Sequence, residues 1–141
     1  MRKEPSTQAV KLGPILVAAM KGGAIAAVAN MVLYGATRAA GVSYVGEFEG
    51  PGKAGALPAF LPAVASFVPS IVAGLLAFVL AKFSSKAAVI FLVISVVFSV
   101  VSMMGPVNVG GSDNATKAVL GLMHIVAAVP ITMMVLRALK H

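Results

Sequence analysis

The chain has 141 residues, of which 60% are hydrophobic and only 11% are charged, and its mean hydropathy is +1.01. A typical soluble domain is about half apolar and about a quarter charged. This chain therefore has too few charged side chains to cover the surface of a water-soluble domain of its size. The composition excludes a soluble globular enzyme and a disordered chain, and it predicts an integral membrane protein.

A membrane-spanning helix needs roughly 20 mostly apolar residues, and the stretches between charged residues show where such helices fit. Three uncharged stretches of 28, 26 and 19 residues are sufficient by themselves, at 54–81, 87–112 and 118–136. A fourth stretch, 22–37, has 16 uncharged residues. It becomes part of a span if Lys21 is tolerated near a face of the membrane.

Helix-breaking residues limit these stretches. Gly105 and Pro106 are expected to end the third helix, and Asp113 has the short acceptor side chain that starts the fourth. We predict an all-α fold, in which residues 1–141 form a single integral membrane domain of four antiparallel transmembrane helices. A longer outer loop joins the first two helices, and its segment 42–49 has the composition of a short hairpin or lid. The spans are predicted at about residues 12–39, 63–81, 87–104 and 115–138.

The basic residues are unevenly divided between the two ends of such a bundle. Four spans place both termini and the turn at 82–86 on one side, with seven Lys and Arg residues, against three on the other side, Lys21 being left aside. Because Lys and Arg are enriched in cytoplasmic segments, both termini are predicted to be cytoplasmic. The two sets are Arg2, Lys3, Lys11, Lys82, Lys86, Arg137 and Lys140, and Arg38, Lys53 and Lys117.

The formal net charge of +7 is explained by basic residues at helix ends that meet anionic lipid headgroups. Lys21, Lys82, Lys86 and Arg137 are the predicted headgroup contacts. Lys21 has two interpretations: its ammonium snorkels to the headgroups, or it takes part in ion or proton transfer. A nucleic-acid partner is not predicted, because the chain has no Trp and only two Tyr. With no cysteine, we predict no disulfide and no thiolate metal site. His124 has no acidic neighbour and no second histidine in the spans, so no other metal site and no cofactor are predicted.

Polar residues in the spans define a candidate site. At about 1.5 Å of rise per residue, Asn30 and Ser95 lie near one depth, and Tyr34, Ser99 and His124 lie near another, in the outer half of the membrane. Small and polar residues belong at contacts between membrane helices, so the simplest interpretation is an interhelical hydrogen-bond clamp. The alternative is a ligand or proton site built on His124.

Pro130 lies in the middle of the fourth predicted helix. It removes one backbone hydrogen bond and bends the helix. The bend would either serve helix packing or shape a small cavity close to His124, and the sequence leaves both open.

Several short motifs resemble one known family. They are residues 102–106 (SMMGP), 113–117 (DNATK) and 122–124 (LMH), together with Asn30 and Tyr34 ahead of Gly41. The chain resembles a family of small bacterial four-helix membrane proteins of unknown function. The resemblance implies four spans and a location in the bacterial inner membrane, and it implies no activity.

Three functions are compatible with these features. The first is a non-catalytic structural or accessory subunit of a membrane assembly, with the bilayer and either a second copy or another subunit as partners. The second is a transporter or channel for a small solute, formed by several copies, with His124 and Tyr34 lining the site. The third is a lipophilic-ligand binder or membrane enzyme, and no catalytic residue is assigned because no nucleophile, base and orienting group can be assembled.

Overall fold

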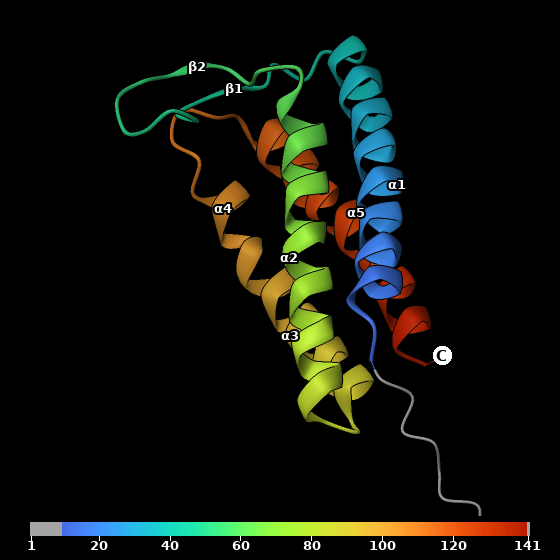
Figure 1. The fold of residues 1–141 in the computed structure, drawn as a ribbon. Coiled ribbons are helices and arrows are strands. Elements are labelled where there is room, and N and C mark those ends of the chain that lie inside the picture. Colours follow the sequence, from blue (N-terminus) through green and yellow to red (C-terminus); the bar gives the residue numbers. More distant parts are fainter. Residues whose placement is uncertain (1–9, 141) are drawn as a thin grey trace, which may run out of the picture.

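The computed structural model describes residues 10–140 and is dominated by helices (Figure 1). Four helical segments are long and apolar enough to cross a membrane, and successive long helices run in opposite directions (Figure 1). The predicted all-α, antiparallel four-helix fold is confirmed. The helices are α1 (Leu12–Ala39), α2 (Leu61–Phe83), α3 (Ala87–Ser102), the single turn α4 (Met104–Val107) and α5 (Asn114–Leu139).

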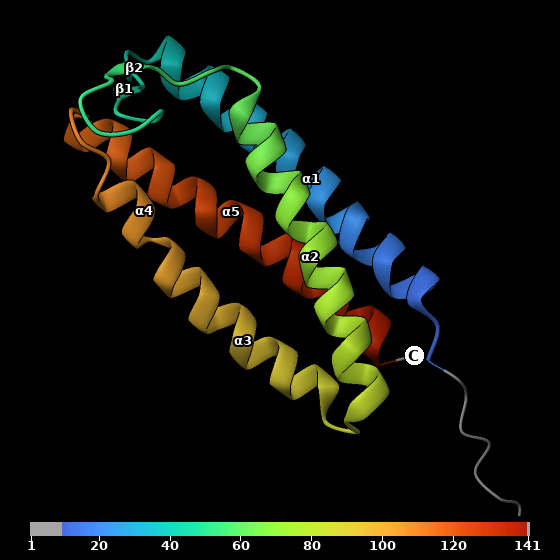
Figure 2. The same ribbon diagram turned by 60° about the vertical axis from the view of Figure 1, so that its left-hand side comes forward.

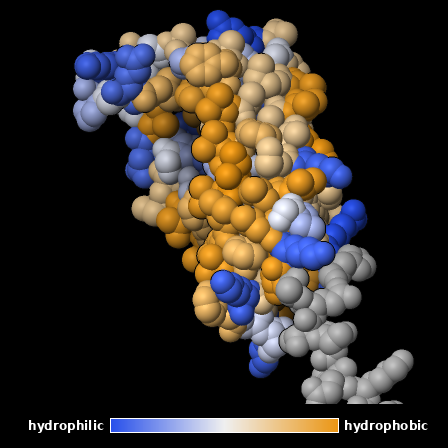
Figure 3. Space-filling view, viewed as in Figure 1, coloured by the Kyte–Doolittle hydropathy of each residue, from blue (hydrophilic) through white to orange (hydrophobic). Residues whose placement is uncertain are grey.

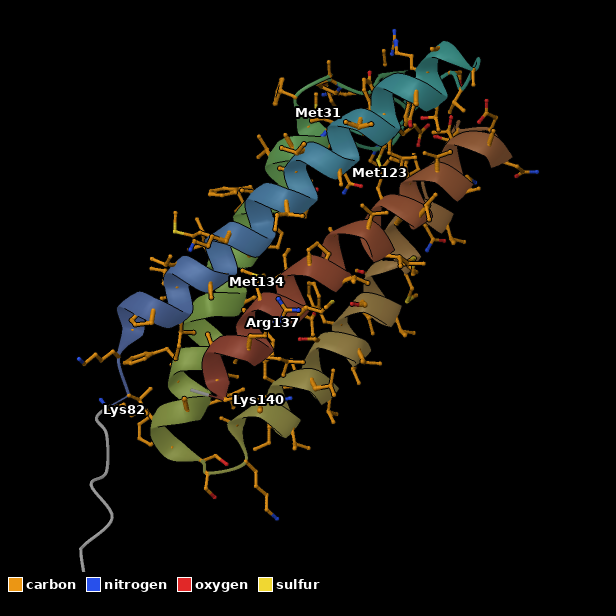
Figure 4. The ribbon with its side chains drawn as sticks, turned by 90° about the vertical axis from the view of Figure 1, so that its right-hand side faces the viewer. Met31, Lys82, Met123, Met134, Arg137 and Lys140 are labelled. Atoms are coloured by element: carbon orange, nitrogen blue, oxygen red, sulfur yellow. The ribbon has the colours of Figure 1, made fainter. Side chains whose placement is uncertain are left out.

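The hydrophilic groups are distributed as expected for a membrane bundle. The start of α1, the turn between α2 and α3, and the end of α5 lie at one end of the molecule, and the other two connections lie at the opposite end (Figures 1 and 2). Lys82, Arg137 and Lys140 are found toward the first end (Figure 4). Hydrophobic surface covers most of the helical body in Figure 3. Arg2 and Lys3, which belong to the predicted basic set, lie outside the described residues.

Helix α1 makes the most extensive helix contacts of the bundle, since it packs along both α2 and α5. A Cβ atom at Gly22 would lie 2.7 Å from the Ile131 Cα and 2.9 Å from the Pro130 carbonyl oxygen of α5. On the adjacent face of α1, a Cβ atom at Gly23 would collide with Ser70 of α2. The absence of side chains at these two positions lets three helix backbones approach closely. Pro130 lies at this contact with α1, which gives it a packing role.

Helix α3 stands apart from this three-helix core. It contacts α2 and α5 much less than α1 does, and Figure 2 shows it separated from them along most of its length. Only 11% of the apolar window spanning Ala87–Val107 is buried, against 33% for Leu12–Ala39. Close contacts at small residues therefore bring α1, α2 and α5 together, whereas α3 is held more loosely.

The end of the third helix differs from the prediction. Gly105 and Pro106 do not terminate it, because α3 ends at Ser102 and these two residues lie within α4. Proline fits here because the first turn of a helix leaves its N–H groups without intrahelical partners. The third span thus continues beyond a local break, as an apolar segment from Ala87 to Val107.

The loop after α1 forms a short hairpin, and only its first strand lies within the predicted segment 42–49. Strand β1 (Val45–Gly46) pairs antiparallel with β2 (Gly55–Ala56). The hairpin is fastened to the connection before α5, since the Glu47 N–H donates to the Gly110 carbonyl at 2.8 Å and the Ser112 hydroxyl donates to the Val45 carbonyl at 2.8 Å. It covers the loop end of the bundle (Figure 1).

Tyr44 anchors the hairpin to α1 and α5. Its side chain is fully buried and its backbone has a φ of +51°, a conformation that non-glycine residues rarely adopt. Its backbone N–H donates to the Thr116 hydroxyl at 3.2 Å, and its hydroxyl lies 2.6 Å from that of Thr37. Burial raises the pKa of Tyr44, and the hydrogen bond to Thr37 partly offsets that rise.

Asp113 is the N-cap of α5, as the sequence predicts. Its carboxylate accepts hydrogen bonds from the Thr116 N–H at 2.6 Å and from the Ser43 hydroxyl at 3.0 Å. The hydrogen bonds from Thr116 and then Ser43 hold the pKa of Asp113 below its usual range. A negative charge is favourable at this position because the N-terminus of a helix carries a partial positive charge.

The contact at Gly22 predicts that alanine substitution changes the free energy of unfolding differently at two glycines of α1. Gly22→Ala should lower the free energy of unfolding by about 1–3 kcal/mol, because the new methyl group meets the backbone of α5. Gly35→Ala is the matched control, because a Cβ there meets nothing within 4 Å, and it should be neutral or slightly stabilising. Thermal unfolding in detergent measures both. Equal effects at the two positions would contradict the close approach.

Candidate functional site

A cavity of about 800 Å³ lies between α2, α3 and α5. It exists because α2 and α5 both pack on α1 while α3 stands away from them. Residues of the outer loop, Glu47 and Phe48, line its upper part, and Leu76, Phe91 and Thr132 line its deepest part. Ligand pockets in proteins typically have volumes of about 300–1,000 Å³, so the cavity has the size of a binding site.

The cavity opens sideways between α2 and α3. Val68 and Val72 of α2 and Ile94 and Phe98 of α3 line it, and all four side chains are exposed. In a membrane-spanning chain, exposed apolar side chains at this depth face the hydrocarbon of the bilayer. The opening therefore gives lipid chains access to the interior.

The opposite end of the bundle is filled. Ile15, Ala19, Ala77, Phe91 and Val135 form a buried cluster there, with further apolar side chains packed around it. The cavity does not continue through this cluster to the end that holds the α2–α3 turn. The cavity is therefore a recess that is open at the side of the bundle and extends up to the outer loop.

Four of the five predicted site residues meet at this cavity. Asn30 of α1, Ser95 and Ser99 of α3, and His124 of α5 all line it. The lining also includes Ser66 of α2 and Met123 of α5, which were not among the predicted site residues. The sequence could have indicated Ser66, because Ser66 and Ser70 are spaced four residues apart and share one face of the second predicted helix. It could not have indicated Met123, which contributes its backbone carbonyl.

Asn30 joins the three core helices. Its side-chain Nδ2 donates to the Ser66 hydroxyl of α2 at 2.8 Å and to the Met123 carbonyl of α5 at 2.9 Å. The Ser66 hydroxyl in turn donates to the Pro62 carbonyl at 2.6 Å. The Oδ1 atom of Asn30 is buried and has no hydrogen-bond partner. The amide nitrogen of Asn30 therefore forms the predicted hydrogen-bond clamp between helices, whereas its amide oxygen makes no hydrogen bond among the described residues.

Among residues 10–140, His124 has a hydrogen-bond partner for one of its two ring nitrogens. Its Nδ1 lies 2.8 Å from the Leu120 carbonyl of the same helix. A carbonyl only accepts hydrogen bonds, so Nδ1 carries the proton in this geometry, and Nε2 of the neutral ring is an acceptor. The ring is half-buried and lines the cavity.

The serines of α3 face the cavity instead of packing against a neighbouring helix. Ser99 donates to the Ser95 carbonyl at 2.7 Å, and Ser102 donates to the Ser99 carbonyl at 2.8 Å. These two hydroxyls are satisfied by their own helix, as is common for serine in membrane helices. Ser95 is half-buried on the same wall.

Tyr34 is not part of this cavity. Its hydroxyl donates to the Leu57 carbonyl at 3.3 Å and accepts from Arg38 at 2.9 Å, and its ring centroid lies 4.6 Å from that of Tyr44. Tyr34 thus belongs to the buried cluster under the outer hairpin. Within the described residues, no hydrogen bond joins Tyr34 to His124, and the predicted pairing of these two side chains does not form.

The predicted headgroup residues are all on the surface. Lys21, Lys82, Lys86 and Arg137 are exposed, and their contact with headgroups stays a prediction. Among residues 10–140, no group of three or more His, Cys, Asp or Glu side chains is placed to hold a metal ion.

The fold and the site together define a multi-pass membrane protein with a laterally open cavity among its helices. The chain belongs to a family of unknown function, DUF6069, which matches residues 10–141. This assignment agrees with the resemblance seen in the sequence. No curated protein and no solved structure matches the chain.

The bonds of Asn30 predict a measurable coupling between helices. Asn30→Ala should lower the free energy of unfolding by about 1 kcal/mol, a typical value for hydrogen bonds between membrane helices. Asn108→Ala is the matched control, since Asn108 is exposed and bonds only within its own segment. Unfolding in mixed micelles of Asn30→Ala, Ser66→Ala and the double variant measures the coupling. Additive effects of the two substitutions would show that their hydrogen bond contributes nothing.

Proposed function

We propose that this protein is a non-catalytic integral membrane protein that holds a lipophilic ligand in the cavity between α2, α3 and α5. The observation that carries this proposal is the cavity itself, which has a ligand-sized volume and an apolar opening toward the side. A gap of this size between membrane helices does not stay empty when lipid can enter it, because empty space forfeits the dispersion contacts of its walls.

The filled end of the bundle favours binding over conduction. A channel needs a path between the two ends, and the cluster around Phe91 and Val135 occupies the end opposite the outer loop. The transporter and the accessory-subunit hypotheses stay predictions. Neither is needed to account for the cavity, and a binding protein of this kind is compatible with an accessory role beside other membrane proteins.

A pair of neighbouring positions on α5 tests the proposal. Ala128 lines the cavity, whereas Val129 is exposed and is absent from its lining. Ala128→Phe should fill the cavity and abolish retention of lipid after gentle extraction, and Val129→Phe should leave retention unchanged. Native mass spectrometry and lipid analysis of the purified proteins measure the retained molecules. Undiminished lipid retention by correctly folded Ala128→Phe would refute a ligand in this cavity.

We also propose that both termini face the cytoplasm in a bacterial inner membrane. The support is the excess of basic residues at the end of the bundle that holds the α2–α3 turn and the end of α5. In the described residues this end includes Lys82, Lys86, Arg137 and Lys140.

The absence of cysteine from the chain makes this orientation simple to test. Ser85→Cys lies in the turn between α2 and α3, and Gly52→Cys lies in the outer loop, and both positions are exposed. In intact cells, a membrane-impermeant maleimide should label Gly52→Cys only. After permeabilisation, both variants should be labelled. Labelling of Ser85→Cys alone in intact cells would reverse the proposed orientation.

A further inference from the structure

We infer that the ligand of the cavity is a bilayer lipid that carries a free hydroxyl group, which donates a hydrogen bond to Nε2 of His124. This inference rests on the proposed function and specifies the chemical class of the ligand. It follows from which polar atoms of the cavity wall are used within the protein and which are left over.

Several polar groups of the wall are already paired. The Ser66 hydroxyl accepts from Asn30 and donates to a carbonyl of its own helix. The Ser99 and Ser102 hydroxyls also donate to carbonyls of their own helix. Both hydrogens of the Asn30 amide nitrogen are used, one by Ser66 and one by Met123. These side chains have no donor to spare for a ligand.

Among the described residues, the polar groups of the wall that make no hydrogen bond through their side chains are the hydroxyls of Ser95 and Thr132 and the carboxylate of Glu47. The remaining ring nitrogen of His124 is also free. Nε2 of His124 is an acceptor because Nδ1 donates to the Leu120 carbonyl. The Asn30 Oδ1 also has no partner, but this atom is fully buried and is not exposed to a ligand in the cavity. A ligand hydroxyl complements this wall, because it can donate to Nε2 of His124 and accept from a serine or threonine hydroxyl, whereas a ligand with only ester or ketone oxygens leaves Nε2 without a donor.

The shape of the cavity suits a long chain below that donor. From His124 to Thr132 the α5 wall extends over eight residues, or about 12 Å. The side chains of Ala127, Ala128 and Ile131 that line this part are apolar. The thickness of one leaflet of hydrocarbon is about 15 Å, half of the bilayer core. This part of the wall therefore accommodates most of a leaflet-length chain beneath a hydroxyl held at His124, and the rest of the chain extends through the opening between α2 and α3.

The inference is tested with two probes that differ only in the donor. The protein in phosphatidylcholine nanodiscs is photolabelled with a diazirine-bearing long-chain alcohol or with its O-methyl ether. The labelled fraction is measured by intact-protein mass spectrometry. Because an unpaired buried acceptor weakens binding by about tenfold or more, the alcohol should label the protein at about one tenth of the concentration that the ether needs. His124→Phe keeps a ring of similar shape and removes the acceptor, so it should bind the two probes equally, at the level of the ether.

The outcomes separate the two proposals. If the native protein binds both probes equally, or if His124→Phe keeps the preference for the alcohol, the hydroxyl inference is overturned and the cavity proposal stands. If neither probe labels the cavity wall, or if Ala128→Phe is labelled as strongly as the native protein, the cavity proposal itself fails. The comparison of the two probes on the native protein needs no variant, so the test holds even if His124→Phe does not fold.

Discussion

The close approach of α1 to its two neighbours determines the rest of the structure. At Gly22 and Gly23 the chain presents no side chain to α5 and α2, so three backbones pack tightly around one crossing point. In a bilayer, where the lipid is as apolar as the helices, such close packing is a main source of association between helices. Once α1 holds α2 and α5 on neighbouring faces, the third span has no comparable close contact, and α3 closes the bundle only loosely.

The cavity is a consequence of this arrangement. Helix α3 has bulky apolar residues on most of its circumference and three serines on the side that faces the gap. The same serines would be suited to a tight seam, but Gly74, the glycine of α2, already packs against Ala19 and Leu16 of α1. The result is an apolar recess with a small polar region, which is the combination found in many ligand sites.

The outer hairpin completes the site from above. It is tied to the start of α5 through Tyr44, Ser43 and Asp113, and its residues Glu47 and Phe48 form the upper wall of the cavity. Tyr34, which sequence spacing placed with His124, is engaged by this hairpin instead. Depth along a helix is therefore a poor guide to contact, since two residues at one depth face each other only if the helices are rotated accordingly.

The sequence by itself determined the membrane class, the presence of four apolar helices and the N-cap at Asp113. These features depend on local composition, on apolar length and on the chemistry of helix starts, all of which are contained in short segments. Only the tertiary structure decided that α1 makes the most extensive helix contacts, that α3 stands apart, and that Asn30, Ser95, Ser99 and His124 share one cavity without Tyr34. These features depend on helix rotation and on competition among several small-residue faces for the same partner, and no single segment encodes the outcome of that competition.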